Sequence, residues 1–245
     1  MGCILKQGGL YTRARIGAIL LAAGQGSRMG SVPKSLLELQ GVPLINRQLI
    51  ALSGAGVDEV VVVTGYHHEL VEPAVEQFSV KVVRNPNPED GQASSVRLGI
   101  EALGSNFDAI IMALSDQPLI NANDITNLIA TFKKRPSGEI LMPVVNGQRG
   151  NPIVLSGTVV GQIIDSGRDM VCRKFMDQHP ELVIPYETDN EHFVFDVDSL
   201  EDLNTFAAKT GQVLKLPNVV DEGHQTTERP EPADLALQKL MLSQP

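Results

Sequence analysis

Short, nearly continuous apolar runs alternate along the chain with longer segments of helical periodicity. The runs that predict strands lie at 16–21, 58–63, 80–83, 108–114, 139–145 and 151–155. The segments that predict helices lie near 43–55, 67–77, 92–104, 121–134, 157–165, 168–178 and 199–209. Continuous apolar strands are typical of a sheet buried on both faces. We therefore predict a Rossmann-like α/β fold, with a mostly parallel sheet, helices on both faces, and ligands at the carboxyl ends of its strands.

The first predicted strand runs into a glycine-rich loop that carries two cationic side chains. The segment Leu21-Ala-Ala-Gly-Gln-Gly-Ser-Arg-Met-Gly30 contains Arg28 and is followed by Lys34. Loops of this kind present backbone N–H groups to phosphates, so a nucleotide is the expected ligand. The spacing excludes the phosphate loop G-x-x-x-x-G-K-[ST], and the third glycine comes one residue late for the dinucleotide fingerprint. Two fixed cations suit a triphosphate that is attacked at phosphorus.

Three aspartates follow predicted strands or lie in a strand-like segment. Asp116 comes directly after the run that ends at Leu114, so its carboxylate can hold Mg²⁺ without crossing the core. Asp196 and Asp198 lie two residues apart, so on a strand both carboxylates point to one face. Asp198 fits a helix N-cap equally well, and Asp196 is therefore the preferred second metal ligand.

Two more segments place polar side chains at predicted turns or helix starts. Ser94 and Ser95 open a predicted helix, where they either donate to a nucleotide or only cap the helix. Arg149 and Asn151 lie in a turn before a predicted strand, where they suit an anionic second substrate or form a solvated hairpin.

Composition narrows the classes of function and the organisation of the chain. The 245 residues carry a formal net charge of −9, which argues against nucleic acid as the main partner. No apolar run approaches the roughly 20 residues of a membrane span, so we expect a cytoplasmic protein without a membrane partner. The two cysteines predict neither a disulfide framework nor a zinc site. We expect an N-terminal extension at 1–15, one domain at 16–212, and at 213–245 a flexible linker that can end in a short helix.

Six segments, in a fixed order along the chain, carry a family resemblance. The first is L-A-A-G-x-G-S-R-M-G-x-x-x-K, and the others are Val61–Tyr66, Glu89–Arg97, Leu114–Leu119, Arg149–Pro152 and Phe195–Asp198. Together they resemble the MobA-like nucleotidyltransferases, and more narrowly the molybdenum cofactor cytidylyltransferases, over residues 16 to about 208. The chain departs from the family's pattern at Asn151, where His is common, and at 167–173, where Gly-Asp-x-Gly-Ala-Arg is common.

The resemblance implies a nucleotide-diphospho-sugar transferase-like fold and a Mg²⁺-dependent transfer of CMP from CTP to molybdenum-loaded molybdopterin, with release of pyrophosphate. CTP is implied by Ala23, because guanylyl-transferring relatives read L-A-G-G there. A hydroxylase of the xanthine dehydrogenase type would receive the product. The implied catalytic residues are Arg28, Lys34 and Asp116, the metal ligands Asp116, Asp196 and Asp198, and the contacts to the second substrate Arg149 and Asn151. The implied nucleotide-binding residues are Leu21, Ala22, Ala23, Gly24, Gly26, Ser27, Arg28, Lys34, Ser94, Ser95 and Asp116.

Two other functions stay open at this point. The chain can be a cytidylyltransferase of the same fold that acts on a sugar or polyol phosphate. It can also be a non-catalytic carrier or insertion chaperone for the molybdenum cofactor, although the retention of Arg28, Lys34 and Asp116 argues for turnover.

Overall fold

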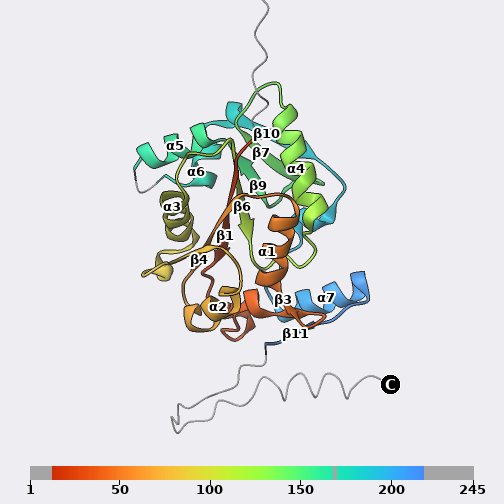
Figure 1. Cartoon of the computed structure of the whole chain (residues 1–245). Helices are drawn as coiled ribbons and strands as arrows, with labels where there is room; N and C mark the ends of the chain where they lie inside the picture. The colour runs from red at the N-terminus through yellow and green to blue at the C-terminus, as the bar shows by residue number, and fades with distance from the viewer. Residues whose placement is uncertain (1–12, 168–169, 218–245) are drawn as a thin grey trace, which may run out of the picture.

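The strands of the described chain form one large sheet and one small one. The computed structural model describes residues 13–167 and 170–217. The strands of the large sheet are β1 (Ile16–Ala22), β4 (Glu59–Thr64), β5 (Lys81–Arg84), β6 (Ala109–Leu114), β7 (Ile140–Val145), β8 (Gln148–Arg149), β9 (Ile153–Leu155) and β10 (Val183–Glu187). Their order is β10-β7-β9-β6-β1-β4-β5, with β8 paired to β7. Figure 1 shows this order from β10 to β4. β9 runs antiparallel to both of its neighbours, and β8 runs antiparallel to β7, while the remaining pairs are parallel.

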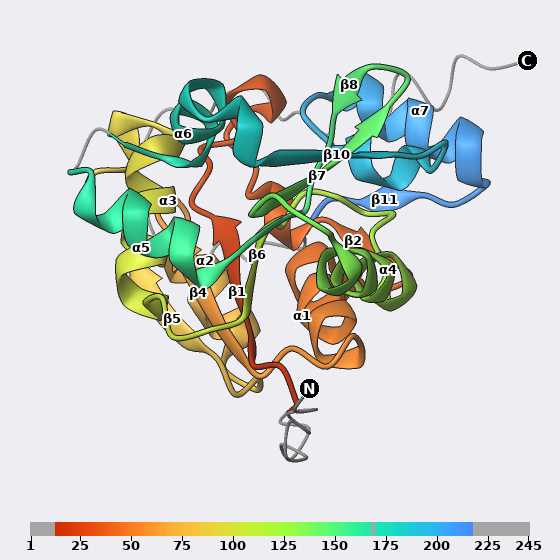
Figure 2. The ribbon, with the colours of Figure 1, turned by 90° about the horizontal axis from the view of Figure 1, so that it is seen from above.

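Helices cover both faces of this sheet. They are α1 (Leu44–Gly54), α2 (His68–Val75), α3 (Gln92–Leu103), α4 (Ala122–Lys134), α5 (Gly157–Asp165), α6 (Cys172–Gln178) and α7 (Leu200–Thr210). Helices α1, α2 and α4 share one apolar core with the sheet, and α3, α5 and α6 share the core on the opposite face. Figure 2 shows α3, α5 and α6 on one side of the strands and α1 with α4 on the other.

Strand β1 lies in the middle of this arrangement and is buried along its whole length. Alternate side chains point to opposite faces of a strand, so Leu20 packs in the core under α1 and α4, and Ile19 packs in the core under α3. Gly99 lets α3 approach closely, because a Cβ there would lie 2.5 Å from Ile19. Burial on both faces explains why the apolar run is continuous.

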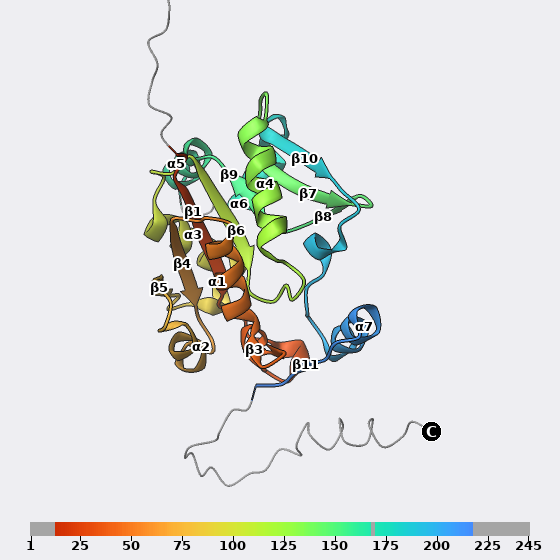
Figure 3. The same ribbon diagram turned by 45° about the vertical axis from the view of Figure 1, so that its right-hand side comes forward.

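A small antiparallel sheet stands at the end of the molecule toward which β1 points (Figure 3). It consists of β2 (Glu38–Leu39), β3 (Val42–Pro43) and β11 (Leu214–Lys215), in the order β11-β2-β3. A third core cluster joins this sheet to α7 and consists of Met29, Leu37, Leu39, Leu44, Val197, Phe206 and Leu214. Strand pairing therefore extends past residue 212, where we expected the domain to end.

The predicted fold class is confirmed, and the predicted strands and helices recur with small shifts of their ends. The predicted helix at 168–178 begins only at Cys172, and residues 168–169 lie outside the described residues. The predictions for 1–12 and 218–245 also fall outside them. The strands that sequence reasoning missed are β2, β3, β8, β10 and β11. In the part of the chain that the structure describes, no helix has the length and apolarity needed to cross a membrane.

Candidate active site

A pocket of about 1030 Å³ opens at the carboxyl ends of the central strands. The loop after β1 lines this pocket, and so do Arg149, the last residue of β8, and Gly150 and Asn151 in the connection to β9. Asp116 follows β6, which stands between β1 and β9 in the sheet. The order of the strands thus places this aspartate between the glycine-rich loop and the turn that carries Arg149, as expected for ligands at carboxyl ends. This volume lies at the upper end of the range of about 300–1,000 Å³ that is typical of small-molecule sites.

The glycine-rich loop folds back on itself through backbone hydrogen bonds. Met29 and Ser31 donate from their N–H groups to the Gly26 carbonyl, at 2.9 and 3.0 Å. Gly26 has φ +68°, and a Cβ there would lie 2.1 Å from the Val32 carbonyl oxygen. Only glycine fits such a position, so Gly26 fixes the turn that presents Arg28 to the pocket.

Two cations of this loop region meet two carboxylates. Lys34 forms an ion pair with Asp198, and its Nζ lies 3.9 Å from Asp116 Oδ2. Arg28 pairs with the second oxygen of Asp198 at 2.9 Å. The side chain of Lys34 is only 18% exposed, whereas that of Arg28 is 71% exposed. Lys34 is thus the fixed positive charge of the site.

The three aspartates have pKa values that differ because their surroundings differ. Burial, opposed by Lys34 and reinforced by Asp196, raises the pKa of Asp116 to about 6. Partial burial and the charge of Asp198 also raise the pKa of Asp196. The hydrogen bond from Lys34, with help from Arg28, lowers the pKa of Asp198. The ionised forms of Asp116 and Asp196 are therefore disfavoured, because the charge of Lys34 does not offset burial and the neighbouring carboxylates.

This donor set fits a divalent cation that a phosphate also holds. The charge of Asp196 raises the pKa of Asp116, and the charge of Asp198 raises the pKa of both, so a cation bound near these carboxylates would relieve their repulsion. Carboxylate oxygens are the ligands that Mg²⁺ prefers, with the rest of its coordination supplied by phosphate and water. No cluster of three His, Cys, Asp or Glu within residues 13–167 and 170–217 could hold a metal by itself. The two carboxylates would therefore need oxygens from a bound phosphate or from water to complete the coordination of such an ion.

The alternative prediction that Asp198 is the N-cap of a helix is wrong by one residue. Ser199 caps α7, and Asp202 reaches back to it in a capping box. Asp198 donates its own backbone N–H to Asp202, at 2.9 Å, and keeps its carboxylate for Lys34 and Arg28. Its side chain therefore belongs to the pocket.

The two candidate serines at the start of α3 have different surroundings. Ser95 lines the pocket, whereas Ser94 is not among the lining residues. The Ser94 hydroxyl donates to the Gly91 carbonyl at 2.8 Å, and Asn85 donates to both serines. Gly91 is the N-cap, so neither serine caps the helix. Of the candidate site residues, Ser94 alone lies outside the pocket lining.

Arg149 and Asn151 both line the pocket, but only Asn151 lies in the connection between β8 and β9, because Arg149 is the last residue of β8. The Arg149 guanidinium pairs with Asp177 of α6 at 2.9 Å, and both side chains are 53% exposed. The Asn151 N–H donates to the Phe193 carbonyl at 2.8 Å, which ties this connection to the segment that carries Asp196. Arg149 keeps enough exposure to meet an anionic ligand.

Sequence reasoning missed the apolar wall of the pocket. This wall consists of Met112, Leu114, Met142, Ile153, Val171, Cys172 and Met176. Most of these side chains belong to the core that packs under α3, α5 and α6. A methionine that lines a pocket leaves the same pattern in a sequence as one that fills a core, so periodicity carries no signal for it.

Ala23 lines the pocket and is packed against the next strand's loop. A Cβ on Gly65, which follows β4, would lie 2.8 Å from the Ala23 Cβ and from its carbonyl oxygen. Gly65 therefore makes room for the methyl group of Ala23. A second contact joins the segment after β4 to the glycine-rich loop. In it, His67 Nε2 lies 2.8 Å from the Gln25 carbonyl oxygen.

A family model described as the MobA-like NTP transferase domain matches residues 18–182. This chain belongs to that family. The resemblance expected from the six segments is thus confirmed at the level of the MobA-like domain. The matched range contains the glycine-rich loop, Asp116, Arg149 and Asn151, and it ends before Asp196 and Asp198.

This MobA-like domain matches different shares of the length of its relatives. Nicotine blue oxidoreductase of Paenarthrobacter nicotinovorans is 27% identical over 76% of this chain and 93% of its own. The bifunctional protein GlmU of Mycobacterium marinum is 32% identical over 51% of this chain, and the match spans only 27% of GlmU. A nucleotidyl transferase from Methanothermobacter has 25% identity and a TM-score of 0.65, covering 80% of this chain and 97% of its own.

Proposed function

We propose that this protein is a Mg²⁺-dependent cytidylyltransferase that transfers CMP from CTP to molybdenum-loaded molybdopterin and releases pyrophosphate. The observation that carries the proposal is that Lys34 and Arg28 pair with Asp116 and Asp198 in one pocket, which Asp196 also lines. The membership of the MobA-like NTP transferase family supports the same chemistry. The protein would serve a molybdenum hydroxylase.

A phosphate oxygen of the acceptor attacks the α-phosphorus of CTP, a new P–O bond forms, and the bond to pyrophosphate breaks. Such a transfer needs in-line positioning and neutralisation of charge on the phosphoryl oxygens. The loop of Gly24, Gly26 and Ser27 provides backbone donors to the phosphates. Lys34 contacts the α-phosphate, and Arg28 neutralises the leaving pyrophosphate.

Asp116 and Asp196 would hold Mg²⁺, with Asp198 as the nearest further carboxylate. When bound, the ion would stabilise the negative charge that develops on the phosphate oxygens. Asp198 is engaged by Lys34 and Arg28 in this structure, so it joins the metal only when phosphates take over those cations. Arg149 and Asn151 would contact the acceptor, a role that their position in the pocket lining supports.

The choice of CTP rests on Ala23, and the choice of acceptor on the family resemblance. Ala23 fills the space beside Gly65, which supports a narrower base site than a glycine there would leave. The departures at Asn151 and at 167–173 concern the acceptor side. A sugar or polyol phosphate is therefore the alternative acceptor, and a carrier without turnover is the alternative of a different class.

One reaction tests base and acceptor together. The protein is incubated with Mg²⁺, all four ribonucleoside triphosphates and either molybdenum-loaded molybdopterin or a panel of sugar and polyol phosphates. We expect a product with the mass of molybdopterin cytosine dinucleotide, together with pyrophosphate. A Lys34→Ala variant, which loses the fixed cation, serves as the inactive control. A product with another base or acceptor would correct that part of the proposal, and no product from any mixture would leave the carrier function.

A redox reaction is a second candidate, because a relative aligned over 93% of its own length is named an oxidoreductase. The apolar wall of the pocket would then receive a flat organic substrate. If the protein consumes NADH or NADPH when a flat organic substrate is supplied, and turns over no triphosphate, this candidate would be supported over nucleotidyl transfer.

A further inference from the structure

The segment 190–198 carries both Asp196 and Asp198 to the pocket without the support of a long helix or strand. It contains a short 3₁₀ turn, Glu191–Val194, and then runs in extended form to the start of α7. Irregular backbone of this kind needs side-chain contacts to hold one geometry. The position of the two carboxylates therefore depends on what anchors this segment.

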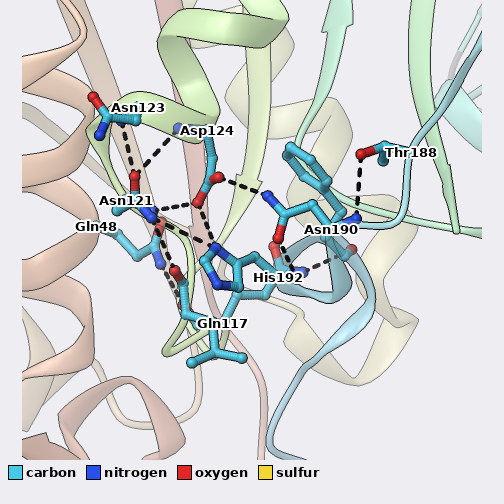
Figure 4. A network of polar contacts seen from close by, with 10 residues as sticks. Gln48, Gln117, Asn121, Asn123, Asp124, Thr188, Asn190 and His192 are labelled. Carbon is cyan, nitrogen blue, oxygen red and sulfur yellow. Dashed lines mark hydrogen bonds and ion pairs between the residues drawn. The ribbon is translucent and has the colours of Figure 1, made fainter. Parts of the chain in front are cut away.

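The first anchor is a buried aspartate on α4. Asp124 is 5% exposed and completes the capping box of α4 by accepting the Asn121 N–H at 3.1 Å. Its two oxygens also accept from Asn190 Nδ2 at 2.8 Å and from His192 at 2.9 Å (Figure 4). His192 Nδ1 faces a carboxylate, so this nitrogen carries the proton and donates. The contacts with Asn190 and His192 exceed what a helix cap requires.

The second anchor lies on the pocket side of the same segment. The Phe193 carbonyl accepts from Gln117 Nε2 at 3.2 Å and from the Asn151 N–H at 2.8 Å. The Val197 N–H donates to the Asp116 carbonyl at 3.0 Å. The segment is thus bound to α4 on one side and to the residues of the site on the other. Asp124, Asn190 and His192 do not line the pocket themselves.

We propose that His192 and Asp124 are positioning residues, which hold segment 190–198 so that Asp196 and Asp198 stay beside Asp116. This positioning role rests on the proposed function, because it assigns His192 and Asp124 to the part of that site that would hold the metal ion. The loss of a group that is hydrogen-bonded directly to a metal ligand typically costs about 10- to 100-fold in metal affinity or activity. His192 and Asp124 act through the backbone of the segment instead, so we expect a loss at the lower end of this range.

The test uses the full chain and two readouts that do not depend on turnover. Mn²⁺ binding in the presence of CTP is measured by electron paramagnetic resonance, and hydrogen exchange is followed in peptides that contain Val197. We expect His192→Ala to weaken Mn²⁺ binding about tenfold. We also expect the Val197 amide to exchange faster, because its hydrogen bond to Asp116 loses support. In turnover assays, kcat falls and the Mg²⁺ requirement rises, while the KM for CTP at saturating Mg²⁺ stays near the wild-type value.

Two variants separate positioning from a general loss of stability. His192→Asn places an amide N–H donor near the position of Nδ1, and we expect it to restore most of the Mn²⁺ affinity. Arg135→Ala removes contacts at the opposite end of α4, where this guanidinium donates to the Gly138 and Phe132 carbonyls at 2.9 Å. We expect it to lower the melting temperature and leave Mn²⁺ affinity and Val197 exchange unchanged.

The outcomes distinguish this inference from the proposed function. Wild-type Mn²⁺ affinity and exchange in His192→Ala would overturn it, as would an equal loss of affinity in Arg135→Ala or an absence of Mn²⁺ binding in the wild type. If the wild type turns over no triphosphate while the differences in Mn²⁺ binding and exchange hold, nucleotidyl transfer fails and the positioning role stands.

Discussion

The carboxyl group of Asp116 costs folding free energy at neutral pH, because burial raises its pKa from 3.8 to about 6. Between these pH values the folded chain binds more protons than the unfolded chain, so this contribution to stability falls as pH rises from about 4 to about 6. A shift of about two units corresponds to at most about 3 kcal/mol. Such a cost is typical of groups kept for function rather than stability.

Asp116→Asn removes the ionisation and therefore this cost. We expect the variant, without metal, to be more stable than the wild type at pH 7.5 and to lose that advantage at pH 4.5. Urea unfolding in the presence of a chelator at both pH values measures the difference. A variant that is less stable than the wild type at pH 7.5 would contradict the assignment of the raised pKa.

At the scale of elements, Arg97 of α3 stabilises the C-terminal end of α5. Its guanidinium donates to the carbonyls of Ile163, Ile164 and Gly167 at 2.8 to 2.9 Å. The last carbonyls of a helix have no partner within the helix, so a cation with several donors both satisfies them and complements the helix dipole. Arg97 thereby fixes the start of the connection that leads to Val171 and Cys172 in the pocket wall.

Arg97→Ala leaves the half-buried carbonyls of Ile163 and Ile164 without this donor, and we expect it to lower the free energy of unfolding by about 1–3 kcal/mol. Arg97→Lys is expected to recover only part of this loss, because an ammonium group cannot reach three carbonyls in a planar fork. Equilibrium urea unfolding measures both variants. Glu101→Gln, which disturbs only the pair between Arg97 and Glu101, is the control. An equal loss in the control would show that the carbonyl contacts contribute little.

The strands that sequence could predict are the ones whose two faces are buried. β1 and β6 read as continuous apolar runs for that reason. β10 was missed because it lies at the edge of the sheet, alternates in exposure and contains Pro185, which is tolerated at an edge. β2, β3, β8 and β11 have two residues each, too few to show a period.

The same contrast applies to the site. That Arg28, Lys34 and the three aspartates lie in one pocket could be predicted, because charged residues near the ends of apolar segments stand out from their surroundings. The anchors of segment 190–198 could not, because Asp124 in the sequence has the pattern of an ordinary helix cap. Its bonds to Asn190 and His192 join residues 66 and 68 positions away, which only the fold brings together.

At the scale of the whole molecule, the small sheet joins the C-terminal part of the described chain to the glycine-rich loop. Leu214 is 4% exposed and packs in one cluster with Met29 of the loop and Val197 between the two acidic residues. Residues 213–217 therefore belong to the folded domain, and they support both sides of the site.

Two shortened chains test this placement. A chain that ends after residue 212 loses β11, whereas one that ends after residue 217 keeps it. We expect the shorter chain to be less stable by roughly 2–5 kcal/mol, the usual cost of removing one large buried side chain. Urea unfolding compares the two, and Leu214→Ala in the full chain provides an independent measure. Equal stability of the two shortened chains would place the end of the domain at 212.

Under the proposed function, a nucleotide binds Lys34 and Arg28 by displacing the Asp198 carboxylate from them. In a chain of net charge −9, the two cations are neutralised internally before any triphosphate arrives. The incoming phosphates take the place of the Asp198 carboxylate. The affinity for the nucleotide therefore reflects only the difference between the free energies with which Lys34 and Arg28 bind these two anions. The displaced Asp198 carboxylate would then be free to help hold a divalent ion bound with the nucleotide. The same side chain would thus serve first as an internal counter-ion and then as a metal ligand.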